Sequence, residues 1–438
     1  MVNLIIKYAF RHNIPLVLNK ANKKGNYPIL KAINNKNIEL IKLIIEYAED
    51  NNIILEINKE NKKGDFPILR AVEFNNREMV KLIFEYAKKH HIIIKINVID
   101  QFDNYPFLES VKNNNVEIAK LIIKYVENKN IIMEINKANE NRSFPILKAI
   151  EHNNIEMTKL IVEYAKKHII IMKTNRMDKY DNYPFLESIK NNNVEMVKLI
   201  IEYAENNNII LKINEADKQG IFPIIKAIEY NNMELVKLIV EYSEQHNVIL
   251  NINKVKWSSD IPILKAIKNN NIEIYKLLFE YVKRHNIILN INEKNYRNEY
   301  PILEAFKNNN VEMVRIMVEY TLKSNIIIKF TRLRSKEYPF SVVVISNNNI
   351  EMTQLIIEYI IKTNKCTNLI KEEVMSFTKL VSKIDIPLKS YENLIKIKNN
   401  KKYVTYKRYI NLNETKPRIK RKNDNESHIC KNNKRVKL

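Results

Sequence analysis

The fold of this chain is decided by a stretch that reads GDFPILRAVEFNNREMVKLIFEYAKKHHIIIKIN at residues 64–97. Pro67 suits the first turn of a helix, because its missing N–H costs nothing there and its φ is already helical. A short apolar segment follows, then Asn75-Asn76, then a longer segment with a wide apolar stripe from Met79 to Phe84. The stretch therefore predicts two antiparallel helices joined by a tight turn.

This unit recurs at a constant spacing along most of the chain. The spacing is marked by prolines, the last of them one residue early: Pro28, Pro67, Pro106, Pro145, Pro184, Pro223, Pro262, Pro301 and Pro339. A fixed period of this length is typical of a solenoid, in which each unit buries its apolar face against its neighbours. A period of two units is also present, since the units at Asn104 and Asn182 share the segment NYPFLES.

The predicted turn between the two helices carries asparagine at two positions. The first position is Lys36 in one unit and Asn in the others, and the second position is Asn in all nine. Asn tolerates a left-handed backbone, which suits the first position, and is a strong N-cap, which suits the second. A Glu two residues later favours the helix N-terminus, and in most units a Lys three residues further on predicts a helix-face pair such as Glu39 with Lys42.

At this point the chain resembles the ankyrin repeat family. The segment INKENKKGDFPILRAV (57–72) is similar to the family's loop and the start of its first helix, and REMVKLIFEY (77–86) is similar to its second helix. The resemblance covers roughly residues 1–364. It implies an all-α solenoid of stacked helical hairpins that binds a protein partner.

The units depart from the family pattern in three ways. An aromatic residue stands before the proline in eight of nine units where the family has Thr, as in Phe66, and the family's His two residues after the proline is apolar, as in Leu69. The unit is also about six residues longer than usual. The extra residues fall in AEDNNIILEIN (48–58), where we expect a longer second helix and an extended apolar segment.

We expect four regions along the chain. Residues 1–22 form the second half of a truncated repeat, 23–364 form nine ankyrin-like repeats, 365–395 contain a C-terminal capping helix, and 396–438 are a basic low-complexity tail. The tail holds 15 Lys and Arg against 3 Asp and Glu, a net +12, so the rest of the chain carries +11 of the total +23.

A tyrosine recurs near the end of each second helix, from Tyr8 to Tyr359. We expect a structural column, with each ring buried between units and each hydroxyl at the rim. His12, His90, His168 and His246 recur at every second unit. Because stacked helices are about 8–10 Å apart, these histidines are too far from one another to share a metal ion.

The resemblance places partner binding on the concave surface formed by the loops before each proline and by the first helices. Residues vary at the loop tips, and we expect the partner to contact the large side chains there: Phe102, Tyr180, Trp257, Tyr296 and Arg297. Drift on tolerant loops is the alternative explanation of this variation. Charges of both signs three residues after the proline argue against a continuous nucleic-acid surface.

Composition argues against catalysis. The chain has three glycines, each in a repeat loop, and two cysteines, Cys366 and Cys430, so we find no phosphate-binding glycine motif, nucleophile–base pair or metal-ligand cluster. We therefore expect a non-enzymatic scaffold with no cofactor, no metal, no small-molecule substrate and no membrane span, located inside the cell.

The basic tail supports a second function. Two clusters, KPRIKRK at 416–422 and KRVK at 434–437, resemble a bipartite nuclear import signal. The residues concerned are Lys416, Arg418, Lys420, Arg421, Lys422, Lys434, Arg435 and Lys437. The alternative function is therefore a nuclear or nucleic-acid-associated protein that acts through its tail by binding an import receptor or nucleic acid, with the repeats as a spacer.

Overall fold

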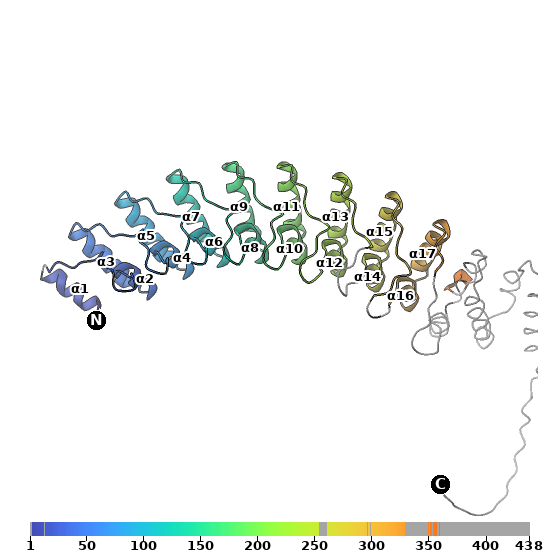
Figure 1. Cartoon of the computed structure of the whole chain (residues 1–438), viewed down its shortest axis with the longest axis horizontal. Coiled ribbons are helices and arrows are strands. Elements are labelled where there is room, and N and C mark those ends of the chain that lie inside the picture. Colours follow the sequence, from blue (N-terminus) through green and yellow to red (C-terminus); the bar gives the residue numbers. More distant parts are fainter. Residues whose placement is uncertain are drawn as a thin grey trace, which may run out of the picture. The chain divides into compact units, whose positions relative to one another are not determined.

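The computed structural model describes residues 2–12, 14–253, 261–295, 297, 299–328, 349, 351–352, 354–356 and 359. The chain divides into two units, Met1–Met317 and Val318–Leu438. Regular secondary structure in the described part is entirely α-helical. The first unit is a row of helix pairs in two layers, as the all-α prediction required (Figure 1).

Each of the repeats from α2 to α17 contributes one short and one long helix. Helix α1 (Val2–Arg11) comes first in the chain. The first helices of the repeats are α2 (Pro28–Asn34), α4 (Pro67–Glu73), α6 (Pro106–Lys112), α8 (Pro145–Glu151), α10 (Pro184–Lys190), α12 (Pro223–Glu229), α14 (Pro262–Lys268) and α16 (Pro301–Lys307). The second helices are α3 (Ile38–Asp50), α5 (Arg77–Lys89), α7 (Val116–Asn128), α9 (Ile155–Lys167), α11 (Val194–Asn206), α13 (Met233–Gln245), α15 (Ile272–Arg284) and α17 (Val311–Lys323).

The first helix of each repeat begins at its proline for the reason expected from the sequence. In α10, Tyr183 occupies the N-cap position with an extended backbone (φ −144°, ψ 160°), and Pro184 is the first helical residue. Phe185, Leu186 and Ile189 are buried. A helix this short is not stable alone, so this burial between neighbouring first helices maintains it.

The turn between the helices confirms both predicted roles of the asparagine pair. Asn192 has φ 53°, in the left-handed region. Asn193 is the N-cap of α11, and its side-chain oxygen accepts a hydrogen bond from Met196 N over 3.0 Å. The same two conformations recur in every repeat whose turn the structure describes, including the one with Lys36, whose φ is 54°.

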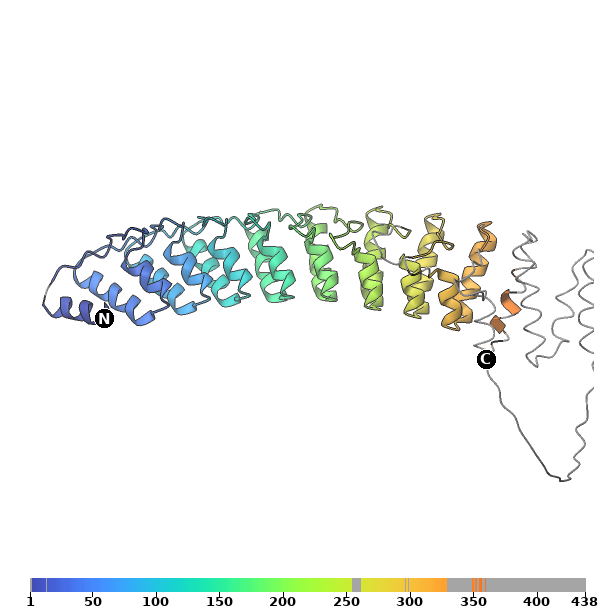
Figure 2. The same cartoon turned by 60° about the horizontal axis from the view of Figure 1, so that its bottom comes forward.

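A second left-handed residue, which the sequence analysis did not predict, ends each second helix. In α11 this residue is Asn208 (φ 54°), and Ile209 N then donates to Ala204 O over 2.8 Å. The chain continues as the expected extended apolar segment, in which Leu211 and Ile213 are buried. These segments run along one edge of the row of helices (Figure 2).

The tyrosine column is structural, as expected, but its hydroxyls are not at the rim. The Tyr164 ring is buried, and its Oη accepts a hydrogen bond from Met133 N in the preceding repeat over 2.9 Å. Tyr203 accepts one from Met172 N in the same way and donates to Ile170 O over 3.2 Å. These hydroxyls therefore tie the extended segment of one repeat to the second helix of the next, whereas Tyr8, the first of the column, is 58% exposed and not buried as expected.

Candidate partner-binding surface

Where the structure describes it, the loop before the proline is a compact turn organised by one acidic or amide side chain. In the repeat that contains α10, Asp178 Oδ1 accepts hydrogen bonds from Tyr180 N at 2.7 Å and from Asn182 N at 2.9 Å. Asp181, between them, has φ 62°. Asp100 makes the same two contacts around Phe102. The loop tip is therefore held in one conformation by its own hydrogen bonds.

Neighbouring tips are also joined to each other through the main chain. Lys218 N donates to Tyr180 O over 3.0 Å, and Glu140 N donates to Phe102 O over 3.3 Å. An equivalent bond joins Lys62 N to Lys24 O. These bonds join the tips in pairs, one pair for every two repeats.

Two of the five predicted contact residues are exposed aromatic side chains on these tips. Phe102 is 53% exposed and Tyr180 is 57% exposed. Lys179 Nζ lies 5.0 Å from the centre of the Tyr180 ring, a cation–π contact. Arg297 is exposed, and its backbone N–H donates to Asn295 Oδ1 over 2.9 Å. Trp257 and Tyr296 lie outside the described residues.

All the import-signal-like residues of the tail also lie outside the described part of the chain. They are Lys416, Arg418, Lys420, Arg421, Lys422, Lys434, Arg435 and Lys437. The same is true of the predicted capping helix in 365–395. The boundaries of the four expected regions therefore remain predictions.

The first helices lie on the inside of the bend of the row and carry paired charges (Figure 1). The residues three and six positions after the proline form an ion pair within most of these helices: Arg70–Glu73, Glu109–Lys112, Lys148–Glu151, Glu187–Lys190, Lys226–Glu229 and Glu304–Lys307. The order of the signs reverses from each repeat to the next between α4 and α12. This inner face is therefore electrically balanced, which does not suit a phosphate backbone.

Helix α14 differs, because both of its charged positions are lysines. Lys265 Nζ lies 3.5 Å from Glu229 of the preceding repeat, and Lys268 Nζ lies 2.5 Å from Glu299 of the following loop. The balance of charge is thus kept by acidic groups of neighbouring repeats.

Three carboxylates of the inner face are substantially buried, and they are Glu109, Glu187 and Glu304. Burial raises the pKa of Glu109, although the hydrogen bond from Lys112 lowers it in part. Burial also raises the pKa of Glu187, and its Oε2 has no hydrogen-bond partner. Lys190, 3.6 Å from Glu187, is shared with Asp217 at 2.7 Å. Glu109 and Glu187 each follow a loop that carries an exposed aromatic tip, and they are two repeats apart.

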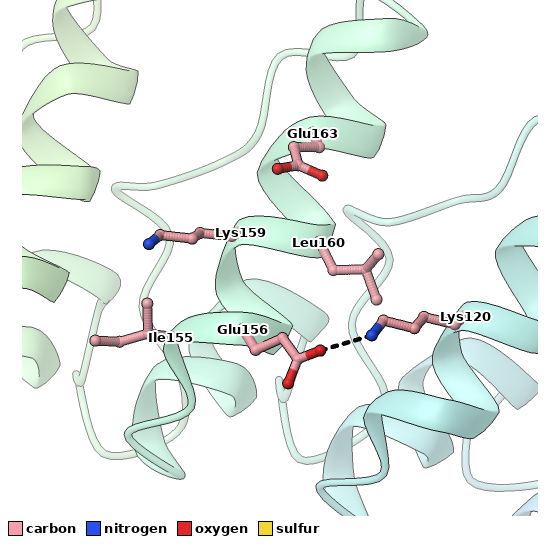
Figure 3. Close-up of a pocket in the computed structure, with 6 residues that line it drawn as sticks. All are labelled: Lys120, Ile155, Glu156, Lys159, Leu160 and Glu163. Carbon is pink, nitrogen blue, oxygen red and sulfur yellow. Dashed lines mark hydrogen bonds and ion pairs between the residues drawn. The ribbon is translucent and has the colours of Figure 1, made fainter.

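A shallow open groove of about 410 Å³ lies on the layer of second helices and not on the inner face. It is lined by residues of α7 and α9, and Figure 3 shows Lys120 reaching Glu156 across it. Their Nζ–Oε1 distance is 2.6 Å, and this hydrogen bond raises the pKa of Lys120. The groove contains surface ion pairs and no arrangement of an acid, a base and a nucleophile.

The ion pair of the groove is one of a series between neighbouring second helices, and these pairs are shorter than the predicted pairs within one helix, such as Glu39 with Lys42. Lys42 lies 3.8 Å from Glu39 in its own helix but 2.8 Å from Glu78 in the next repeat. The same preference recurs for Lys120 and Lys159. The lysine side chain extends toward the N-terminus of the neighbouring second helix, where a carboxylate is already favoured.

The histidines that recur at every second repeat pack on tyrosines. The His90 ring centre lies 4.3 Å from that of Tyr86, and His246 lies 4.2 Å from Tyr242. Among the described residues, no group of three His, Cys, Asp or Glu side chains is placed to hold a metal ion. Within the same part of the chain, no helix is both long enough and apolar enough to cross a membrane.

The family model for ankyrin repeats (three copies) matches the chain twice, at residues 107–210 and 186–291. The repeats within residues 107–291 are ankyrin repeats. Together the two matches cover the hairpins from α6 to α15, which have the geometry described above. Ankyrin repeats generally mediate protein–protein interactions.

Solved ankyrin structures are similar to part of the chain. The ankyrin repeat domain of Bcl-3, described as a unique member of the IkappaB protein family, is 16% identical over 58% of this chain and 99% of that one, with a TM-score of 0.40. The ankyrin repeat domain of human ASB11 is 17% identical over 55% of this chain and 91% of that one, with a TM-score of 0.37. An ankyrin repeat domain from Acinetobacter baumannii is 18% identical over 50% and 98%, with a TM-score of 0.38. No curated protein matches the chain.

Proposed function

We propose that this ankyrin protein is a non-catalytic scaffold that binds a protein partner along the edge formed by its loop tips and on the adjoining inner face. The observation that carries the proposal is the exposure of Phe102 and Tyr180 on tips that are already ordered by hydrogen bonds. Large aromatic side chains contribute most to the binding free energy when they are held rigidly, because little conformational entropy is then lost on binding.

Spacing and charge support a protein ligand. Phe102 and Tyr180 are two repeats apart, which is about 20 Å for stacked helices and about six residues of an extended peptide. The tips around them carry Lys62, Lys63, Lys179 and Lys218, with Glu140 in between. A partner segment with two apolar anchors and acidic residues near them would match this edge.

The test is capture of partners from a nuclease-treated lysate at about 200 mM salt, where nonspecific phosphate contacts are weak. A protein recovered in stoichiometric amount is then titrated against the wild-type chain and the double variant Phe102→Ala, Tyr180→Ala. We expect the double variant to bind at least about tenfold more weakly. The matched control is Ile249→Ala, which changes an exposed side chain on an extended segment instead of a tip.

The tail-based alternative makes a different prediction. If the chain acts through its tail, deletion of 396–438 abolishes partner or nucleic-acid binding, and binding falls steeply between about 50 and 200 mM salt. Loss of binding on tail deletion with no effect of the tip variants would refute the scaffold proposal. The electrically balanced inner face favours the scaffold over a repeat array that itself holds nucleic acid.

A further inference from the structure

A row of exposed isoleucines follows the extended segments of seven consecutive repeats. We call it the isoleucine row, and its members are 52–71% exposed: Ile54, Ile93, Ile132, Ile171, Ile210, Ile249 and Ile288. They occupy the same position in each of these repeats without exception. A row of large exposed apolar side chains at one repeated position is a candidate interaction surface.

The stack itself does not need an isoleucine at these positions. The neighbouring residues of the segment, such as Ile94, are the buried ones. The contact between repeats uses the main chain of the row, because Asn58 Nδ2 donates to Ile93 O over 2.7 Å. Any residue that favours an extended backbone would make that bond, including polar ones such as Thr.

Charged side chains beside the row alternate in sign. A charged residue lies two positions after each of the first four isoleucines of the row. These residues are Glu56, Lys95, Glu134 and Lys173, and all are exposed. The ends of the adjacent second helices repeat the alternation at Glu49, Lys88, Glu127 and Lys166. Lys59, Lys137 and Arg176 lie on the same segments, so both signs are present and a partner of uniform charge would be repelled at some of the positions.

An alternating row is complementary to itself when a second copy is related to the first by a two-fold rotation. We propose that this face pairs with the same face of a second copy of the chain, about a two-fold axis between the repeats of Ile93 and Ile132. Ile93 then meets Ile132 of the second copy, and Lys95 meets Glu134 of the second copy. Because the contact is isologous, each of these pairings occurs twice.

The same axis also pairs the two outer repeats of the four, which are those of Ile54 and Ile171. Glu56 faces Lys173 of the second copy, and Ile54 faces Ile171 of the second copy. Both glutamates also meet a lysine of their own chain, Glu56 with Lys59 at 2.5 Å and Glu134 with Lys137 at 3.7 Å. Those contacts are exposed and worth little, so pairing across the two-fold axis can replace them.

Sedimentation velocity of the full chain, from low micromolar to several hundred micromolar, tests the proposal. We expect a concentration-dependent monomer–dimer equilibrium. Lys95→Glu and Glu134→Lys should each weaken dimerisation by roughly tenfold, because each places like charges opposite one another at two symmetric sites. An equimolar mixture of the two variants should recover wild-type affinity, since the heterodimer again pairs Glu with Lys twice.

The mixture separates contacts between copies from contacts within one chain, because neither variant alone contains the restored pair. The double variant Ile93→Ser, Ile132→Ser should abolish dimerisation, while Ile249→Ser with Ile288→Ser, outside the four-repeat face, should leave it unchanged. Thermal melts establish that each variant is folded. A wild-type chain that stays monomeric throughout, or single variants that the mixture does not rescue, would overturn the proposal.

Discussion

Asn232 donates its side-chain amide N–H to the side-chain oxygen of Asn192 in the preceding repeat, over 2.8 Å. Asn192 has the left-handed backbone of the turn (φ 53°), and Asn232 is the N-cap of α13. The same bond joins five further pairs: Asn115–Asn75, Asn154–Asn114, Asn193–Asn153, Asn271–Asn231 and Asn310–Asn270. The asparagine pair therefore forms the turn, caps the helix and links adjacent repeats.

Two substitutions of Asn192 should separate its role in the left-handed turn from its role in the hydrogen bond to Asn232. We expect Asn192→Val to lower the free energy of unfolding by roughly 1–2 kcal/mol, because a β-branched residue resists the left-handed conformation. Asn192→Gly keeps that conformation and loses only the bond to Asn232, so it should cost less. Urea unfolding of the two variants measures the difference, and an unchanged stability for Val would refute the role assigned to the turn.

The repeat with Lys36 provides the converse experiment. Lys36 has φ 54° and no side-chain oxygen to accept a bond from Asn76. Lys36→Asn should raise the free energy of unfolding by about 1 kcal/mol, since it supplies an acceptor and suits the backbone. Urea unfolding beside the wild type measures the gain, and a loss of stability would contradict the linking role of the asparagine side chain.

Ile169 is held in a conformation that disfavours its side chain. Its φ is 56° and it is 90% exposed, whereas the equivalent residue is Asn in most other repeats. We expect Ile169→Asn to stabilise the chain by about 1 kcal/mol, because the strain of a β-branched residue is removed and no buried contact is lost. The matched control, Asn208→Ile, should destabilise by a similar amount in the same thermal melts.

The buried tyrosine hydroxyls should contribute measurably to stability. Tyr164→Phe removes the acceptor of Met133 N and leaves that buried N–H without its partner. We expect a loss of about 1–3 kcal/mol in the free energy of unfolding. Tyr8, whose ring is 58% exposed, is the control, and Tyr8→Phe should have little effect. Equal effects at both positions would contradict the proposed link between the repeats.

Glu187 should make stability depend on pH in a specific direction. Burial raises its pKa, so the folded state holds the proton more tightly than the unfolded state does. This contribution favours folding below the ordinary pKa of glutamate and is lost as the pH rises through the raised pKa. Glu187→Gln should therefore raise the Tm by a few degrees at neutral pH and by less near pH 4.

The comparison for that variant is Glu163→Gln, which changes an exposed carboxyl of the outer groove. Its melting temperature should match that of the wild type at both pH values. If Glu187→Gln lowered the Tm at neutral pH, the ion pair with Lys190 would outweigh the cost of burial.

Several features could be predicted from the sequence because they depend on local geometry. Pro184 restricts φ at the start of α10, and the Asn192-Asn193 turn needs only the backbone preferences of asparagine. Exposure of Phe102 and Tyr180 followed from their place in loops that vary between repeats. The left-handed end of each second helix was missed, although the recurring Asn at positions such as Asn208 was a signal for it.

Other features depend on which repeats become neighbours in space. The sequence placed Lys42 beside Glu39, but stacking brings Glu78 closer, so the stronger ion pair forms between repeats. The tyrosine hydroxyls were expected at the rim, because nothing in the sequence showed that the extended segment of the preceding repeat would present its N–H to them.

The sequence by itself determined the repeat length, the all-α hairpin of each repeat and the caps of its helices, because each of these depends on residues within one unit. Only the tertiary structure decided how the units bind one another and which faces they leave exposed. Hydrogen bonds such as that from Asn232 to Asn192, and alignments such as the isoleucine row, arise when residues a full repeat apart in the chain are brought side by side. That separation is far beyond the reach of local backbone preferences, and it is bridged by the packing of one hairpin on the next.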